Sequence, residues 1–354
     1  MRLGLRESKP EVLVAATGPG RAVGGTSLDW EGLWERYGMA TVLAVVWLVA
    51  GVGLTGFATT DNIASVALQS SFIGIAAVGM TMAIIAGTFD LSVGSTLALT
   101  AWVGVLLARR YGVPLAIAGT IGAGVFIGLI NGFLVVVVRI PALIATLGML
   151  FVIRGVHFIL SGGQSAQYSG HEFTNLGNGD IFGVPIPFLV FVVLAVFGSL
   201  VLRRTPYGRY LYAYGSNPTA SVTAGVPVRR TLIAVFVTTA LFTSIAAFLL
   251  GARLYSAGPE LDAGFELNVI ATVVLGGTRL AGGRGYMLGT AAAAMLFATL
   301  ANVLNLLHTD SFLQKVAVGL VLVAALSIAG IRERLSERFE RFRDSTPEDP
   351  GLAS

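Results

Sequence analysis

Apolar residues form about ten blocks along the chain, separated by polar or charged stretches. A helix needs roughly 20 mostly apolar residues to cross the hydrocarbon core of a membrane. The expected crossings are 39–57, 63–86, 91–108, 113–138, 142–160, 187–202, 231–250, 286–307 and 312–331. A shorter block at 267–275 is expected to be a half-helix or a tilted partial span. The pattern predicts an all-α polytopic membrane helix bundle with about ten transmembrane segments.

The polar segments differ in their content of Lys and Arg. Those before the first block, between 203 and 230, and after the last block are rich in Arg, whereas 161–187 contains neither residue. Because cytoplasmic loops carry an excess of positive residues, we expect both termini and the 203–230 loop in the cytoplasm and 161–187 outside. Arg109 and Arg110 then fall outside, against the rule, so eight or nine spans stay as alternatives.

The same pattern divides the chain into three regions. Residues 1–38 contain no uninterrupted apolar run, so we expect a largely flexible cytoplasmic tail and no cleavable signal peptide, although 30–37 is amphipathic. Residues 39–331 are expected to form one transmembrane domain. Residues 332–354 are expected to form a charged cytoplasmic tail.

Composition supports a membrane location. The chain is 55% hydrophobic and 12% charged, with a mean hydropathy of +0.81, whereas soluble domains carry about 25% charged residues. The net charge of +4 sits beside apolar spans, so we expect it to set topology in a plasma membrane and to meet lipid, not nucleic acid. Cysteine is absent, which excludes disulfides and thiolate chemistry.

The sequence lacks the residues of an ATPase and of most enzymes. A phosphate-binding loop needs GxxxxGK[ST], and neither lysine of the chain, Lys9 or Lys315, lies in such a setting. We interpret the glycine-rich run 276–285 as a tight cytoplasmic turn. No clustered acid–base or metal set is recognisable. We therefore expect no enzyme activity, no metal and no cofactor in this chain, with ATP and Mg²⁺ bound by a separate subunit.

Ionisable residues inside the expected spans are few. Asp61, Asp90 and Asp310 lie at span ends, so an ion-coupled carrier, which usually places carboxylates at membrane depth, lacks an obvious carrier group. Arg154 and His157 lie three residues apart on one helical face. They belong either to a translocation path or gate, or to a structural contact in which Arg154 extends to the helix end.

Several polar residues are candidates for lining a translocation path. Gln69, Ser70 and Ser71 form a polar patch in the middle of a span, where polar groups need partners or a wet cavity. Asn302 and Asn305 are weaker candidates of the same kind.

Other polar and small residues have a structural interpretation. We expect Asp90 to cap the third span, followed by Ser92 and Gly94 in its first turn. Gly124, Gly128 and Gly132 repeat every four residues, a spacing that lets helices pack closely. Asn131 beside them can hydrogen-bond across helices and is also retained as a path candidate.

One segment of the 203–230 loop carries a helix start and stop. Asn217 as N-cap, Pro218 at the first helical position and Gly225 after the end predict a short helix outside the membrane. Such a helix is marginal alone in water, so we expect it to dock against a partner. Its residues are Asn217, Pro218, Thr219, Ala220, Ser221, Val222, Thr223 and Ala224.

These segments together resemble the permease family of ribose-, xylose- and arabinose-type importers of the ATP-binding-cassette (ABC) class. The matching segments, in the family's order, are 87–95 (GTFDLSVGS), 128–132 (GLING), 140–148 (IPALIATLG) with Arg154 and Gly155, 205–210 (TPYGRY), 274–278 (VLGGT), 282–285 (GGRG) and 302–307 (NVLNLL). Departures are Phe89, where many members have Ile, and Asn268, where an Asp is common. Phe89 and residues 34–39 bring the chain closer to the arabinose-type branch.

The resemblance implies a fold, a function and partners. It implies the ABC importer permease fold, a path for a small sugar such as arabinose, ribose or xylose, and a second permease chain. It also implies a cytoplasmic sugar-type ATPase and an extracytoplasmic binding protein. In such transporters a coupling helix docks on the ATPase, and that role falls on residues 217–224. Alternative cargoes are a nucleoside, an autoinducer or inositol, and an ion-coupled carrier is the alternative class.

Overall fold

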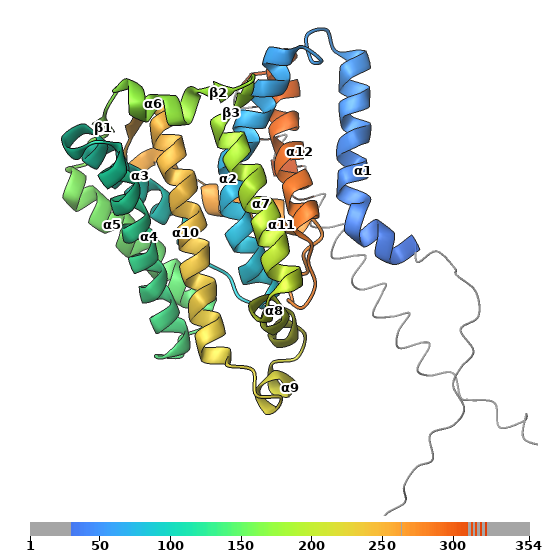
Figure 1. Ribbon diagram of the computed structural model, residues 1–354, viewed down its shortest axis with the longest axis vertical. Coiled ribbons are helices and arrows are strands. Elements are labelled where there is room, and N and C mark those ends of the chain that lie inside the picture. The colour runs from blue at the N-terminus through green and yellow to red at the C-terminus, as the bar shows by residue number, and fades with distance from the viewer. Residues whose placement is uncertain are drawn as a thin grey trace, which may run out of the picture.

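The computed structural model describes residues 30–310 apart from Ala263, together with five helical positions between 313 and 323 (Figure 1). Residues 1–29 and 332–354 of the predicted tails, and most of the predicted crossing at 312–331, lie outside the described residues.

Within the described residues, eight long helices form the body of the molecule. They are α1 (Trp30–Gly53), α2 (Thr60–Ile85), α3 (Val93–Tyr111), α4 (Val113–Val136), α5 (Ala142–Ser161), α7 (Ile186–Arg204), α10 (Val228–Leu254) and α12 (Met287–Leu306). The short helices are α6 (His171–Asn178), α8 (Pro206–Ser216), α9 (Pro218–Thr223), α11 (Phe265–Leu275) and the 3₁₀ turn η1 (Pro259–Asp262). The expected all-α polytopic helix bundle is confirmed.

Seven of these helices are long and apolar enough to cross a membrane, namely α1, α2, α4, α5, α7, α10 and α12. Helix α3 is not among them, and its last turn carries Arg109 and Arg110. Helix α11 has only 11 residues, as expected for a half-helix. The chain is therefore a multi-pass membrane protein.

Helix α2 occupies the centre of the bundle and α1 its outside (Figure 1). In the apolar window of α2, 83% of the residues are buried, against 11% in that of α1. Helix α2 packs against α10, α12, α7 and α11, and α10 also packs against α4 and α3. The hydrophobic core therefore lies between α2, α3 and α10, where it includes Ile75, Met80, Leu97 and Phe248.

Helices α4 and α10 approach each other closely because glycines face the contact. A Cβ on Gly128 would lie 2.7 Å from the carbonyl oxygen of Phe236, and one on Gly132 would lie 3.2 Å from Cα of Ile233. At Gly124 a Cβ would overlap the hydroxyl of Ser244. The predicted close-packing face at Gly124, Gly128 and Gly132 is confirmed.

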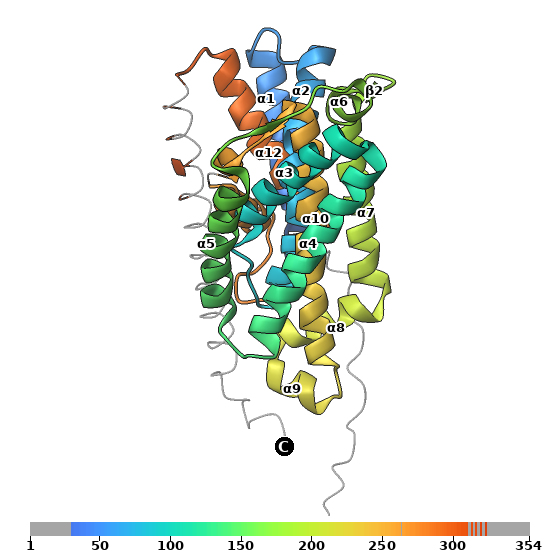
Figure 2. The same cartoon turned by 90° about the vertical axis from the view of Figure 1, so that its left-hand side faces the viewer.

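The two ends of the bundle carry different short elements (Figures 1 and 2). At one end, here called the α6 end, lie α6 and two small antiparallel strand pairs. The pairs are β1 (Ala166–Gln167) with β4 (Ser256–Ala257), and β2 (Asp180–Ile181) with β3 (Val184–Pro185). At the opposite end, the α9 end, lie α8 and α9. The predicted external loop 161–187 and the predicted cytoplasmic loop 203–230 therefore lie at opposite ends.

Two sequence expectations need correction. Helix α1 begins at Trp30, so the predicted flexible tail does not extend to residue 38. Residues 33–36 (Leu, Trp, Glu, Arg) include good helix formers, and the amphipathic stretch continues directly into the first crossing. The 203–230 loop contains a second helix, α8, which the sequence interpretation missed. Thr205 caps it by accepting a hydrogen bond from the Gly208 amide at 3.2 Å, with Pro206 at the first helical position.

Candidate functional site

Helices α2 and α3 are separated by a short segment whose polar side chains are buried. Asp90 is 1% exposed and Ser92 is fully buried. Oδ1 of Asp90 accepts hydrogen bonds from the Ser92 amide at 2.9 Å and from the Ser92 hydroxyl at 2.6 Å. These two bonds hold the chain in the turn that separates the helices.

Asp90 is not the N-cap of α3, which corrects the sequence expectation. The N-cap position belongs to Ser92, and no side-chain hydrogen bond caps the helix there. The turn at residues 91–92 shifts the helix start to Val93, so the Asp90 carboxylate bonds the amide two residues later instead of the first helical turn. Gly94 is buried in that first turn.

Asn131 ties α4 to this segment. Its Nδ2 donates to Oγ of Ser92 at 2.8 Å and lies 3.2 and 3.3 Å from the two carboxylate oxygens of Asp90. Asn131 is fully buried, and its Oδ1 has no hydrogen-bond partner within the described residues. We call Asp90, Ser92 and Asn131 the Asp90 cluster.

Helix α5 is attached to the same segment. Oγ1 of Thr146 accepts the Leu91 amide at 3.1 Å and donates to the Ala142 carbonyl at 2.8 Å. The Asp90 cluster and Thr146 therefore join the junction of α2 and α3 to both α4 and α5. A buried carboxylate held by neutral donors is stable only while those donors stay in place, so these contacts favour one arrangement of four helices.

The predicted polar patch of α2 divides between two environments. Ser70 and Ser71 are buried, and both hydroxyls donate to the Ala67 carbonyl at 2.8 Å. Gln69 is exposed. The three residues do not share one face because successive helical residues point in directions about 100° apart. Gln69 is therefore the exposed member of the patch.

The two asparagines of α12 lie near the α6 end. Asn302 is 5% exposed and forms a reciprocal amide pair with Asn62 of α2, with N···O distances of 2.7 and 3.0 Å. Trp47 of α1 donates to Oγ1 of Thr299 at 2.9 Å one turn earlier. Asn302 thus contributes to helix packing, whereas Asn305 is exposed.

Arg154 and His157 occupy different surroundings on α5. His157 is 1% exposed, and its ring lies 5.6 Å from that of Trp102 on α3. Arg154 is partly buried. The buried ring of His157 packs α5 against α3, so the pair does not present two polar groups to one open space.

The predicted short helix at 217–224 is confirmed as α9. The Asn217 side chain accepts the Ala220 amide at 2.9 Å, and Pro218 occupies the first turn. Gly225 follows the helix with a φ of 78°, a backbone conformation that favours glycine. Val222 is 61% exposed on this helix. Helix α9 therefore presents an apolar side chain at the tip of the molecule (Figure 1).

The glycine-rich run 276–285 packs against α8 and the end of α2. The Gly283 amide donates to the Ile85 carbonyl at 2.9 Å. A Cβ on Gly215 of α8 would overlap that carbonyl oxygen, and one on Gly282 would lie 2.9 Å from Cα of Gly87. We call Gly87, Gly215, Gly282 and Gly283 the glycine junction. The run 276–285 is a tight turn, as expected. The glycine junction brings the backbones of this turn, of α8 and of the segment after α2 into contact.

Tyr212 fastens the glycine junction on its α8 side. Its hydroxyl donates to the Gly285 carbonyl at 2.8 Å. Burial, with a smaller contribution from Tyr286, raises the pKa of Tyr212 to about 12. The hydroxyl therefore keeps its proton, and this hydrogen bond, at neutral pH.

The glycine junction was not identified as a functional feature from the sequence. Gly215 and Gly87 lie far apart along the chain, and a lone glycine has no pattern that names its partner. The only available signal was the density of glycines in 276–285. Taken together, the junction places α9, through α8, in contact with the end of α2 that leads to the Asp90 cluster.

The described residues contain no three His, Asp or Glu side chains that could hold a metal ion. The site therefore consists of helix contacts, buried hydrogen bonds and an exposed short helix. Such an arrangement can transmit movement between helices.

Residues 62–326 match the family described as the permease component of branched-chain amino acid transport systems. The L-arabinose transport system permease protein AraH of Escherichia coli K12 is 35% identical over 302 residues, which cover 85% of this chain and 92% of that protein. AraH of Azospirillum brasilense is 35% identical over 313 residues, covering 88% and 91%.

A ribose relative is equally similar. The ribose import permease protein RbsC of Escherichia coli K12 is 35% identical over 304 residues, covering 84% of this chain and 94% of that protein. No solved structure matches the chain. The resemblance to ribose- and arabinose-type permeases is confirmed over nearly the whole membrane domain, and the chain belongs to the family of permease components of branched-chain amino acid transport systems.

Proposed function

We propose that this protein is the membrane-spanning permease subunit of an ABC importer for a small sugar, with L-arabinose as the first candidate. The observation that carries this proposal is the 35% identity to two arabinose permeases over most of both chains. Ribose is the second candidate within the same class, because RbsC is as similar.

The proposal requires partners that supply energy and substrate. The chain has no GxxxxGK[ST] sequence, so ATP and Mg²⁺ are bound by a separate cytoplasmic ATPase. A second permease chain, identical or related, encloses the path with this one. An extracytoplasmic binding protein delivers the sugar at the α6 end.

The α9 end faces the cytoplasm in this proposal, with both termini on that side of the plasma membrane. The basic residues of the 203–230 loop support this orientation, because they favour the cytoplasmic side. Helix α9 then serves as the coupling helix, and its exposed Val222 meets the ATPase.

Transport proceeds by alternating access without bond-breaking chemistry in this chain. ATP binding moves α9, and α8 passes the movement through the glycine junction to the end of α2. The close contacts of Gly215 and Gly283 support this route, because backbones without side chains between them move together. The Asp90 cluster then shifts α3, α4 and α5 relative to one another.

Gln69 is proposed to line the path, since it is the exposed member of the polar patch at 69–71 of the central helix α2. Asn305 and Arg154 are secondary candidates. The Gln69→Ala variant should assemble normally and alter sugar uptake. Uptake equal to that of the wild type would remove Gln69 from the path.

Uptake by the reconstituted transporter tests the function directly. Permease, ATPase and binding protein are placed in vesicles with ATP inside, and entry of labelled arabinose, ribose, xylose, a nucleoside and inositol is compared. We expect arabinose to enter only when ATP and all the proteins are present. Uptake driven by an ion gradient without ATPase would overturn the class, and uptake of another solute alone would overturn the substrate.

Variants of α9 test the coupling role. Val222→Asp should reduce co-purification of the ATPase, whereas Val138→Asp, at an exposed valine of the same end, should not. Asn217→Ala should weaken coupling, and Asn217→Asp, which keeps a capping oxygen, should restore it. Wild-type uptake and co-purification in Val222→Asp would contradict docking at α9 without affecting the assignment as a permease.

A further inference from the structure

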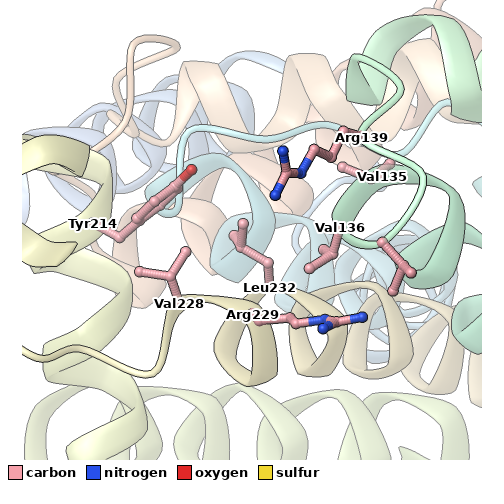
Figure 3. Close-up of a pocket in the computed structure, with 8 residues that line it drawn as sticks. Val135, Val136, Arg139, Tyr214, Val228, Arg229 and Leu232 are labelled. Carbon is pink, nitrogen blue, oxygen red and sulfur yellow. The ribbon is translucent and has the colours of Figure 1, made fainter.

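A pocket of about 400 Å³ opens at the α9 end between the last turn of α4, α8 and the start of α10 (Figure 3). Valines at positions 135–137 and Leu232 form an aliphatic wall. Arg139, Tyr214 and Arg229 supply its polar groups. The lining therefore combines apolar side chains with two cationic ones.

The charges of the pocket are of one sign. Its lining contains two arginines and no Asp or Glu. The guanidinium of Arg139 and the hydroxyl of Tyr214 point toward one another across the pocket (Figure 3). Two cations beside one space with no carboxylate in its lining favour an anion there, and a phosphate matches the forked donors of an arginine.

The backbone at Arg139 has a conformation that is unusual for its residue type. Its φ is 67°, in the left-handed region that glycine usually occupies after a helix. A non-glycine residue there costs of order 1 kcal/mol. Glycine would remove that strain, but it would also remove the guanidinium from the pocket.

An apolar stripe of α4 leads into the pocket. Phe126, Leu129 and Phe133 are 64%, 47% and 53% exposed and follow one another at helical spacing. Val137, one turn after Phe133, belongs to the pocket wall. An acyl chain lying along this stripe would place the headgroup of its own lipid beside Arg139.

We propose that this pocket binds the headgroup phosphate of an anionic phospholipid, with its acyl chains along Phe126, Leu129 and Phe133. That this lipid belongs to the cytoplasmic leaflet rests on the orientation given under Proposed function. Basic pockets between helices on the cytoplasmic side are suited to anionic headgroups. Because α8 and the start of α10 form two walls and flank α9, the lipid would brace the element proposed to dock the ATPase.

Lipid titration tests the proposal without depending on transport. The permease, purified in mild detergent together with its ATPase, is titrated with phosphatidylglycerol and with phosphatidylcholine of the same acyl chains. Bound lipid is counted by native mass spectrometry. We expect tighter binding of phosphatidylglycerol to the wild type, and roughly a tenfold or greater loss in Arg139→Gln/Arg229→Gln.

The matched control is Arg204→Gln/Arg230→Gln, which removes the same charge from exposed arginines at the same end but outside the pocket. It should keep the preference for phosphatidylglycerol. Arg139→Lys, which keeps the charge but loses the forked donors, should give an intermediate loss and covers the case in which the double variant does not fold.

Three outcomes would overturn the lipid site. They are equal binding of both lipids, equal loss in the pocket and control variants, and displacement of phosphatidylglycerol by inorganic phosphate alone. The last result would assign the pocket to a free phosphate. None of them bears on sugar uptake, so failure of this proposal is distinguishable from failure of the transport function.

Discussion

Asn131 contacts the buried carboxylate of Asp90 from another helix, α4. Its amide nitrogen contacts both carboxylate oxygens and the Ser92 hydroxyl. Removing one partner of a buried polar pair leaves the other unsatisfied, which costs more than the pair itself contributes. The Asp90 cluster is thus a point where a single change affects three helices.

We expect Asn131→Leu to lower the stability of the permease by about 1–3 kcal/mol. Asp90→Asn should cost less, because a neutral amide oxygen can still accept the Ser92 amide and hydroxyl. Thermal unfolding of the purified protein in detergent measures both effects. An equal melting temperature for the wild type and Asn131→Leu would contradict the role given to this contact.

The raised pKa of Tyr212 gives a second residue-scale prediction. Its value of about 12 in the folded protein exceeds the ordinary 10.0, so the folded state holds the proton more tightly than the unfolded state. The resulting stabilisation is fully present below pH 10 and is lost as the pH rises through about 12. The difference in melting temperature between the wild type and Tyr212→Phe should therefore narrow across that range. A difference in melting temperature that stays constant from pH 10 to about 12 would contradict the raised pKa of Tyr212.

At the scale of elements, glycines determine how closely the helices pack. On α4, Gly128 meets the backbone of α10, whereas Gly122 of the same helix has open space where its Cβ would lie. Alanine at these two positions is therefore a matched pair that differs only in what the added methyl group contacts.

Gly128→Ala should destabilise the protein by about 1–3 kcal/mol, because the two backbones must separate. Gly122→Ala should be neutral or should stabilise by up to about 1 kcal/mol, because alanine is the better helix former. Thermal unfolding of the two variants gives the comparison. Equal effects would mean that α4 and α10 are not held at the distance seen here.

The glycine junction makes a different prediction, concerning coupling. Gly215→Ala places a methyl group against the Ile85 carbonyl and should shift α8 away from α2. The ATPase should still co-purify, because α9 keeps its exposed face, but sugar uptake per ATP hydrolysed should fall about tenfold. The control is Ala213→Ser, at an exposed position of the same helix. Wild-type uptake in Gly215→Ala would rule out coupling from α8 to α2 through the glycine junction.

For the whole molecule, local patterns in the sequence predicted most elements but few contacts between them. Apolar blocks predicted the long helices because each block must meet lipid or other helices along its length. The cap at Asn217 and the stop at Gly225 predicted α9 for the same local reason. The glycine face of α4 was also readable, since its spacing repeats.

Contacts between distant segments could not be predicted in the same way. Ser70 and Ser71 looked like path residues, yet their hydroxyls bond to their own helix. The cap at Asp90 was misplaced because a turn at 91–92 precedes α3, and the bond from Asn131 to Ser92 in that turn comes from another helix. The pairing of Gly215 with Ile85 joins segments that the sequence separates by more than a hundred residues.

Arg109 and Arg110 provide the sharpest test of the topology. The chain passes from α2 to α3 and α4, and the last turn of α3, which carries these arginines, lies at the opposite end of the bundle from α9 (Figures 1 and 2). If α9 is cytoplasmic, two exposed arginines face outward, against the usual distribution. The fold and the charge rule therefore disagree at this turn.

The absence of native cysteine makes every single-cysteine variant a clean topological probe. Tyr111→Cys and Ser169→Cys, both exposed positions, should react with a membrane-impermeant maleimide in intact cells, whereas Thr223→Cys on α9 should react only after the membrane is opened. If the Ser169→Cys variant is labelled but the Tyr111→Cys variant is not, Arg109 and Arg110 stay on the cytoplasmic side. The preference of arginine for that side would then outweigh the packing of α3 against α4 and α10. Such a result would mean that α3 and one of α4 and α5 do not cross, which removes two crossings from the bundle. It would leave α9 and the glycine junction on the cytoplasmic side, since both lie at the end that Ser169 does not share.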